Sequence, residues 1–188
     1  SPPQRTGLYE LGIERLDDGE VSTWFHDKAQ HGETIEVLGP VGGHFVLDES
    51  NTRPALLIGG GSGVVPLLSM AAQRVGAYSQ AHTTLLVAAR HLDEVLLWPT
   101  LQRWEAFTPR FRSRLALSRD TCAPRAQDHV GRIDGADVAW ALQQLGDVAT
   151  ESAQVFICGR NDFVESIVHM VTGLNVPEVS IRTERFGS

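Results

Sequence analysis

The sequence has no long apolar run, few cysteines and no cluster of basic residues. No stretch of its 188 residues approaches the roughly 18–20 apolar residues that a membrane-spanning helix needs. Its two cysteines, Cys122 and Cys158, are too few for a disulfide framework and do not form a C-x-x-C pair. The formal net charge is −7, without the basic face that nucleic-acid-binding proteins carry. These absences argue against a membrane protein, a disulfide-rich secreted domain and a nucleic-acid binder.

The composition is that of a folded domain. Hydrophobic residues make up 42% of the chain and charged residues 21%, both ordinary values for globular proteins. The chain begins with Ser1-Pro2-Pro3 and continues into polar residues, so we expect no signal peptide and a reducing, cytoplasmic setting. The seven histidines are scattered without metal-ligand spacing, and we expect no metal site.

From residue 54 onward, apolar strand patterns alternate with helix patterns. They predict five strands, at 55–58, 83–89, 114–117, 154–158 and 179–183. They predict helices between these strands, at 62–77, 94–107, 134–145 and 162–174. Asp134 is a suitable N-cap for the third helix, and Pro99 fits the second only where two short pieces meet. The alternation predicts an α/β fold, with a five-stranded parallel sheet and helices on both faces.

Residues 1–48 follow a different pattern. Loose alternation predicts strands at 9–16 and 34–38, and Ser22 can cap a short helix over 23–30. Two strands and one short helix cannot bury a core of their own.

A cluster of glycines follows the first buried strand: Gly59, Gly60, Gly61 and Gly63. Glycines at such a turn let the backbone approach a phosphate, and the helix N-terminus offers free N–H groups. A tight turn without a ligand is the alternative. The strict GxGxxG fingerprint is not met, and Arg90 stands where the usual ribose-binding acid is expected. A GxSxG nucleophile elbow would need glycine in place of Val64, which argues against an α/β-hydrolase.

Three segments together resemble a known family. They are Gly19-Glu20-Val21-Ser22, GGGSGVVP after the first strand, and Cys158-Gly159 together with Glu184-Arg185-Phe186-Gly187. In their order and spacing they resemble the ferredoxin–NADP reductase family, in its bacterial oxygenase-reductase-like branch. The resemblance implies that 1–48 is the C-terminal part of an antiparallel FAD-binding β-barrel and that 49–188 is an NAD(P)-binding domain. It implies hydride transfer from NAD(P)H to FAD, and electron transfer to an iron–sulfur protein, another acceptor or a separate oxygenase component.

The resemblance also implies roles for individual residues. The FAD pyrophosphate would be held at Gly19, Val21 and Ser22. The nicotinamide dinucleotide would face Gly60, Gly61, Ser62 and Gly63. Cys158 and Gly159 would flank the nicotinamide ring, and Phe186 would stack near the flavin. Cys158 and Glu184 are the catalytic candidates.

A serine–arginine pair, Ser118-Arg119, ends the third predicted strand. In NADP-using relatives such a pair binds the 2′-phosphate, and a guanidinium suits a phosphate where an NAD site prefers an acid. Arg90 is a further candidate for cofactor binding. Asp120 adjoins Arg119, and a solvated arginine at a strand end is the alternative. The pattern slightly favours NADPH and leaves NADH open.

Two features depart from the family's pattern. The Arg-x-Tyr-Ser flavin motif does not occur in this sequence, and Arg160 follows Cys158-Gly159 where relatives often have proline. We therefore expect a family member cut partway through its barrel, with weak FAD binding. A non-catalytic nucleotide-binding module, and a subunit whose barrel is completed by another polypeptide, are the alternatives.

Overall fold

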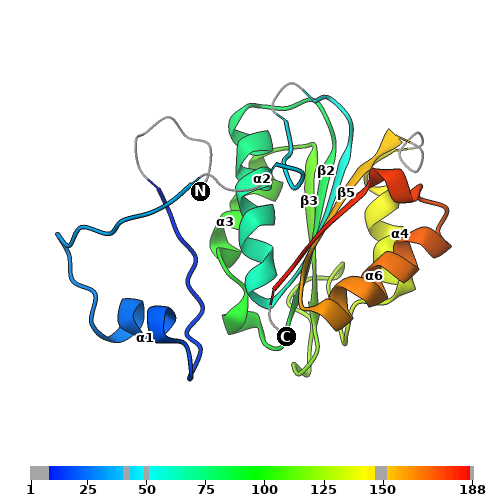
Figure 1. The fold of residues 1–188 in the computed structure, drawn as a ribbon. Helices are drawn as coiled ribbons and strands as arrows, with labels where there is room; N and C mark the ends of the chain where they lie inside the picture. The colour runs from blue at the N-terminus through cyan, green and yellow to red at the C-terminus, as the bar shows by residue number, and fades with distance from the viewer. Residues whose placement is uncertain (1–8, 40–42, 49–50, 147–151, 187–188) are drawn as a thin grey trace.

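A parallel six-stranded sheet lies at the centre of the protein (Figure 1). The computed structural model describes residues 9–39, 43–48, 51–146 and 152–186. The strands are β1 (Ala55–Gly60), β2 (Thr83–Ala89), β3 (Phe111–Leu117), β4 (His129–Val130), β5 (Gln154–Gly159) and β6 (Ile181–Arg185). Their order across the sheet is β4-β3-β2-β1-β5-β6. The predicted number of five strands is wrong, because the two-residue strand β4 is too short to show a pattern in the sequence.

Helices cover both faces of this sheet (Figure 1). One face carries α2 (Val64–Gly76) and α3 (Trp98–Phe107), and the other carries α4 (Gly135–Gln143) and α6 (Asn161–Gly173). The described ranges also contain three short 3₁₀ helices: η1 (Gly61–Gly63), η2 (Leu92–Glu94) and η3 (Glu178–Ser180). None of the helices in the described ranges has the length and apolar composition needed to cross a bilayer.

The core consists of two apolar clusters, one on each face of the sheet. In β1, Leu57 belongs to the cluster beneath α2 and α3, whereas Leu56 and Ile58 belong to the cluster beneath α4 and α6. All three side chains are fully buried, and burial of each contributes about 1.5–3 kcal/mol. A strand buried on both faces has a continuous apolar sequence, which is why the sequence predicted β1 and β2 well.

The helix starts confirm two local predictions. The Asp134 side chain accepts hydrogen bonds from the N–H groups of Ala136 (2.9 Å) and Asp137 (3.0 Å). The Asp137 side chain in turn accepts the Asp134 N–H (3.0 Å), which completes a capping box. Pro99 lies in the first turn of α3, where its missing N–H has no helical partner to lose. The helical pattern over 94–107 is therefore divided, with η2 before α3.

Residues 9–39 do not form the predicted part of an antiparallel barrel. They contain α1 (Glu20–Asp27) and no strand, so the strands predicted at 9–16 and 34–38 are wrong. No residue of α1 is buried. Large apolar side chains of this segment are exposed: Tyr9, Leu11, Leu16, Val21, Ile35, Val37 and Leu38. A strand needs a neighbour for its backbone N–H and C=O groups, and neither stretch has one in the described part of the chain.

Residues 43–48 pack onto the sheet. Leu47 is 3% exposed and belongs to the cluster beneath α2 and α3. The ring of Phe45 lies edge-on to that of Phe156, with the centroids 5.4 Å apart. The predicted division of the chain into domains 1–48 and 49–188 stays a prediction. The apolar core of the sheet nevertheless includes Leu47, with Phe45 packed against it, and both precede residue 49.

Candidate functional site

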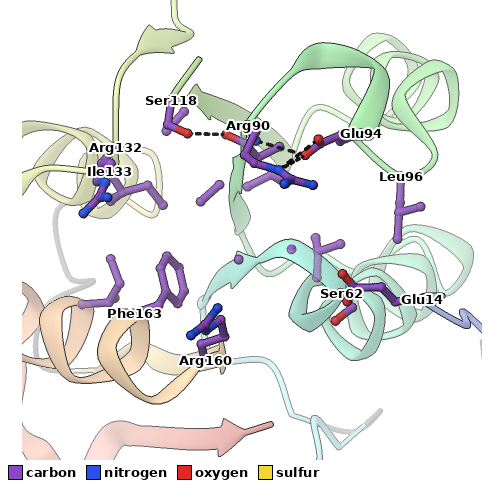
Figure 2. Close-up of a pocket in the computed structure, with 18 of the residues that line it drawn as sticks. Glu14, Ser62, Arg90, Glu94, Leu96, Ser118, Arg132, Ile133, Arg160 and Phe163 are labelled. Atoms are coloured by element: carbon purple, nitrogen blue, oxygen red, sulfur yellow. Dashed lines mark hydrogen bonds and ion pairs between the residues drawn. The ribbon is translucent and has the colours of Figure 1, made fainter. Parts of the chain in front are cut away.

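The sheet changes the direction of its connections beside β1. Strands β2, β3 and β4 follow on one side of β1, and β5 and β6 lie on the other. In open α/β sheets, ligands bind at such a point, outside the carboxyl ends of the strands. A cavity of about 830 Å³ lies there (Figure 2), a size typical of small-molecule and cofactor sites. The ends of β1, β2 and β3, the first turns of α2 and α6, and residues 12–14 line it.

The glycine turn contributes Gly60, Gly61 and Ser62 to this cavity. Gly61 has φ +57°, and the place where a Cβ would stand is open. The left-handed backbone there favours glycine, and Gly61 is exposed. Gly63 has another reason to be glycine: a Cβ there would lie 2.4 Å from the carbonyl oxygen of Cys158. Gly63 is buried against β5 and does not line the cavity, although it was predicted to face the nicotinamide dinucleotide.

The ring of Phe163 in α6 covers two strand-end glycines. A Cβ on Gly60 would lie 3.2 Å from this ring, and one on Gly159 would lie 2.6 Å from it. Glycine at position 159 therefore leaves room for the Phe163 ring, and Gly159 itself does not line the cavity. Figure 2 shows Phe163 and Arg160 on the opposite side of the cavity from Ser118 and Arg90. Phe163 could not be identified from the sequence, because only tertiary contact joins it to the two glycines.

Arginines outnumber carboxylates in the lining of the cavity. Four line it, namely Arg90, Arg119, Arg132 and Arg160, with three carboxylates, Glu14, Glu94 and Asp162. Arg90 Nε lies 3.0 Å from Glu94, and Arg160 Nε lies 4.0 Å from Asp162. In the described ranges, neither Arg119 nor Arg132 forms an ion pair. A chain with a net charge of −7 thus presents local positive charge in this cavity, which suits an anionic ligand.

Glu94 is held as a carboxylate by its neighbour. Partial burial alone would raise the pKa of Glu94, but hydrogen bonds from the Arg90 side chain and backbone outweigh it and lower that pKa. The Glu94 charge is therefore committed to Arg90 and does not cancel the other arginines.

Asp120 does not neutralise Arg119, its neighbour in the sequence. Its carboxylate lies 2.8 Å from His91 Nδ1 and accepts the N–H of Leu92 at 2.9 Å. The hydrogen bond with His91 is the main reason that the pKa of Asp120 lies below its usual value. This pairing ties the loop after β3 to the loop after β2.

Backbone hydrogen bonds continue beyond the ends of β2 and β3. The N–H of Ser118 donates to the carbonyl of Ala89 (3.0 Å), and the N–H of Arg119 donates to that of Arg90 (2.9 Å). The structure thus brings the predicted residues Arg90, Ser118 and Arg119 together, and all three line the cavity.

The predicted catalytic residues Cys158 and Glu184 lie opposite each other on β5 and β6. Burial, with a smaller effect from the Glu184 charge, raises the pKa of the Cys158 thiol to about 11. The thiol is therefore neutral at physiological pH and unsuited to act as a nucleophile. Phe186 donates its N–H to the Gly159 carbonyl (3.2 Å), and its side chain lines the cavity. Cys158 and Glu184 themselves lie beside the cavity lining without belonging to it.

The predicted flavin contacts Gly19, Val21 and Ser22 are not brought to this cavity. Gly19 is the N-cap of α1, and Ser22 Oγ accepts the N–H of Leu16 at 3.2 Å. From the same segment, Gly12, Ile13 and Glu14 line the cavity instead. Glu14 and Ser62 line the same cavity, and Figure 2 draws both on its α2 side; the position of Glu14 could not be predicted from the sequence.

Among the residues that the structure describes, one group of side chains has metal-ligand spacing: His129, Asp134 and Asp137 offer atoms within 4.8 Å of one another. Their other interactions account for the arrangement. Asp137 lies 3.0 Å from Arg114 Nε and 2.8 Å from His129 Nδ1, and Asp134 caps α4. The group thus ties β3, β4 and α4 together.

Comparison with known proteins identifies the family. Residues 57–169 match the oxidoreductase NAD-binding domain, and this stretch is more than half of the chain. This chain belongs to the oxidoreductase NAD-binding domain family. The matched stretch contains the glycine turn and most strand ends around the cavity.

Similar proteins include reductases and flavohemoproteins. Ferredoxin–NADP reductase B of Sorangium cellulosum is 28% identical over 188 residues, covering 99% of this chain and 75% of that protein. A flavohemoprotein of Rhodopirellula baltica is 31% identical over 187 residues, covering 95% of this chain and 45% of that protein. The crystal structure of the FAD/NAD-binding domain of nitric oxide dioxygenase from Vibrio cholerae has 19% identity and a TM-score of 0.76. It aligns with 90% of this chain and 65% of its own.

These findings confirm the predicted membership in a ferredoxin reductase-like family and the α/β class of the fold. The family match covers residues 57–169, whereas the Sorangium relative aligns with 99% of the chain. The chain nevertheless spans less than half of the Rhodopirellula flavohemoprotein, so the activity of a whole protein of that kind is a proposal here.

Proposed function

We propose that this chain is the nicotinamide-nucleotide-binding part of an FAD-dependent NAD(P)H oxidoreductase. The observation that supports this most directly is the cavity at the carboxyl edge of the sheet. It combines an accessible glycine backbone at Gly61 with four arginines at its walls. A nicotinamide dinucleotide needs both features, because its diphosphate binds backbone N–H groups and its charge favours guanidinium neighbours.

Different residues of the chain would bind different parts of the nicotinamide dinucleotide. The N–H groups at Gly61 and Ser62, with the N-terminus of the helix that follows, receive the diphosphate. Ser118 and Arg119, at the end of β3, receive the 2′-phosphate of NADPH. The side chain of Phe163 provides an apolar surface between these two regions.

FAD is the flavin that the family implies, and when bound it would accept the hydride of NAD(P)H. Phe186 would offer an aromatic ring beside it. Cys158 and Glu184 would lie behind the nicotinamide, the first as a neutral apolar wall because its thiol stays protonated. The electron acceptor would be an iron–sulfur protein, a haem domain or an oxygenase component, in keeping with relatives named ferredoxin reductase and flavohemoprotein.

A second candidate is a nucleotide-binding module without flavin chemistry. The observation that favours it is the position of Gly19, Val21 and Ser22 away from the cavity, on a helix with no buried residue. A barrel completed by another polypeptide is the variant of this proposal that would bring these residues into use. The exposed apolar side chains of 9–39 would then have a covering partner.

One experiment separates the two candidates. The purified chain is mixed with excess FAD and desalted, its visible spectrum is recorded, and NADPH is added without oxygen. A retained yellow flavin that bleaches supports the reductase. A colourless protein that still binds NADPH supports the nucleotide-binding module, and a chain that binds neither contradicts both.

A further inference from the structure

The amino edge of the sheet, where the strands begin and which lies opposite the cavity, collects basic residues. Arg53 lies two residues before β1, His82 directly before β2 and Arg110 directly before β3. The N–H of Thr83 donates to the Arg110 carbonyl (2.9 Å), which holds the starts of β2 and β3 side by side. Aspartate and glutamate are absent from the segments that precede the three strands: 51–54, 77–82 and 108–110. A chain with a net charge of −7 thus presents local positive charge at this edge.

The Arg110 side chain is exposed and contacts another basic group. Its Nη1 forms a hydrogen bond with Nε2 of His82. Burial, with the charges of Arg110 and Arg112, lowers the pKa of His82, so the imidazole is neutral at pH 7 and does not repel its neighbour. Other arginines make the arginine–carboxylate ion pairs of the described residues: Arg15, Arg90, Arg114, Arg125 and Arg160. In these ranges, Arg110 is therefore a cation without a carboxylate partner.

Two exposed aromatic rings lie at the same edge. Helices α2 and α3 cover one face of the sheet, and both end at the amino edge because a short loop leads each into the next strand (Figure 1). Tyr78, two residues after α2, is 85% exposed, and Phe107, the last residue of α3, is 82% exposed. A single exposed ring is ordinary, but aromatic rings together with arginine distinguish the centres of protein interfaces.

The backbone at Tyr78 points to a use for its side chain. It ends α2 in a left-handed conformation, with φ +49°, where glycine or asparagine is usual and other residues are disfavoured. The N–H of Tyr78 donates to the Val75 carbonyl (3.1 Å), and the N–H of Ser79 donates to the Arg74 carbonyl (3.0 Å). Only backbone groups of Tyr78 and Ser79 make these bonds, so glycine at position 78 would end the helix with less strain. Helix termination therefore does not account for tyrosine here.

We propose that Tyr78, Phe107 and Arg110 form a docking surface for a protein partner whose contact face is acidic and carries apolar side chains. The partner's carboxylate pairs with Arg110, and its apolar side chains cover the two rings. A nucleic acid fits less well, because the chain as a whole is acidic and repels a long polyanion. The seven residues of β2 span about 20 Å at about 3.3 Å per residue, so a partner docked here leaves the cavity open. The proposal goes beyond the proposed function and does not depend on what the cavity binds.

The probe is a fluorescently labelled synthetic peptide that alternates glutamate and leucine, and its anisotropy with the full chain measures binding. A matched peptide has glutamine in place of glutamate. We expect the glutamate peptide to bind more tightly, and the difference to shrink as added salt screens the charges. Arg110→Gln should weaken binding of the glutamate peptide about fivefold, as for one exposed charge pair. Tyr78→Gly should weaken binding of both peptides about tenfold, as for one aromatic anchor.

The Tyr78→Gly variant separates recognition from folding. Glycine relieves the left-handed strain, so the urea midpoint of this variant should equal or exceed that of the wild type. Two matched controls change similar side chains elsewhere. Arg185 is exposed at the end of β6, at the opposite edge of the sheet, and Tyr9 is as exposed as Tyr78, at 85%. Arg185→Gln and Tyr9→Gly should bind the glutamate peptide like the wild type.

Four results overturn the proposal. Equal affinity for the two peptides removes the charge argument, and wild-type binding by both Arg110→Gln and Tyr78→Gly removes the surface. A single-stranded DNA that binds more tightly than the glutamate peptide makes the partner a nucleic acid. A wild-type dimer in sedimentation that Tyr78→Gly dissociates makes it a second copy of this chain. NADPH titration of the same samples reports on the cavity alone, so a wild-type chain that does not bind NADPH contradicts the proposed function and not the docking surface.

Discussion

Gly63 and Gly61 lie two residues apart in the glycine turn, yet they are glycines for different physical reasons. Gly63 has an ordinary helical backbone, with φ −61° and ψ −12°, so alanine fits its dihedral angles. A Cβ there would nevertheless lie 2.4 Å from the Cys158 carbonyl oxygen and 2.8 Å from the Gly159 nitrogen. Gly61 has open space around its Cβ position but a φ of +57°. Substituting alanine at each position separates steric overlap from backbone strain.

The two alanine variants should differ in stability. Overpacking costs about 1–3 kcal/mol or more, and Gly63→Ala should reach about 3 kcal/mol because it meets the backbone of the central strand β5, which cannot rotate away. At Gly61 the left-handed conformation costs alanine about 1–2 kcal/mol. Reduced freedom of the unfolded chain returns about 0.4–1 kcal/mol. The net loss for Gly61→Ala should therefore be about 1 kcal/mol.

Urea denaturation of both variants and of the wild type measures these losses, and NADPH titration measures the site. Gly61→Ala should stay folded but bind NADPH more weakly, because its methyl group projects into the space the diphosphate would use. A Gly63→Ala variant within about 0.5 kcal/mol of the wild type, a range typical of surface substitutions, would refute the close packing of α2 on β5. Wild-type NADPH affinity in Gly61→Ala would contradict the role of the turn as a phosphate cradle.

Four further predictions concern charge and ionisation. Asp137→Ala should lower the free energy of unfolding by about 3 kcal/mol, because it leaves Arg114 without its partner at 3.0 Å; a loss too small to measure by urea denaturation would contradict this. At pH 8 a thiol reagent should label the exposed Cys122 and spare the buried Cys158, and stoichiometric labelling of both in the folded chain would argue against the buried thiol. Because the pKa of Cys158 is raised from 9.0 to about 11, the unfolded chain loses this proton first as the pH rises. Stability should then fall between about pH 9 and 11, and less so in Cys158→Ala. Arg119→Ala should weaken NADPH binding by about 1–3 kcal/mol with little change for NADH, whereas equal losses would rule out the 2′-phosphate role.

The sheet could be predicted from the sequence wherever burial leaves a continuous apolar run. The run at 83–89 is strand β2 to the residue, because a central parallel strand is covered on both faces. β4 could not be predicted in this way. Its two residues are a strand only because β3 lies beside them and because Asp137 holds His129.

The strands predicted at 9–16 and 34–38 are wrong for the opposite reason: the local pattern is present, but the neighbour that a strand requires is not seen in the described residues. Alternation at 9–16 and 34–38 is compatible with a strand, but a strand also needs a partner. In the described part of the chain His26 Nε2 lies 2.9 Å from the carbonyl oxygen of Ile13. A side chain there occupies an acceptor that a neighbouring strand would otherwise use. The alternating pattern is present in the sequence, but among the described residues no strand lies beside it.

The site was predictable where a local motif marks it. Gly61, Ser118 and Arg119 each follow a strand whose end could be found from the sequence, so parallel pairing brings them to one edge. Arg132 and Phe163 follow no such rule. The first depends on the pairing of β4 with β3, and the second on the contact of one ring with two glycines from different strands.

The nucleotide cavity and the predicted flavin contacts differ in what holds them in place. The lining of the cavity includes buried residues of both apolar clusters, such as Val87 of one and Ala116 of the other. Val21 and Ser22 lie on a helix with no buried residue, in a segment whose large apolar side chains face solvent. Few buried contacts mean a low free energy of local opening. Nucleotide binding should therefore survive conditions that abolish flavin binding, and a polypeptide that covers 9–39 would strengthen flavin binding while leaving the affinity for adenosine 2′,5′-bisphosphate unchanged.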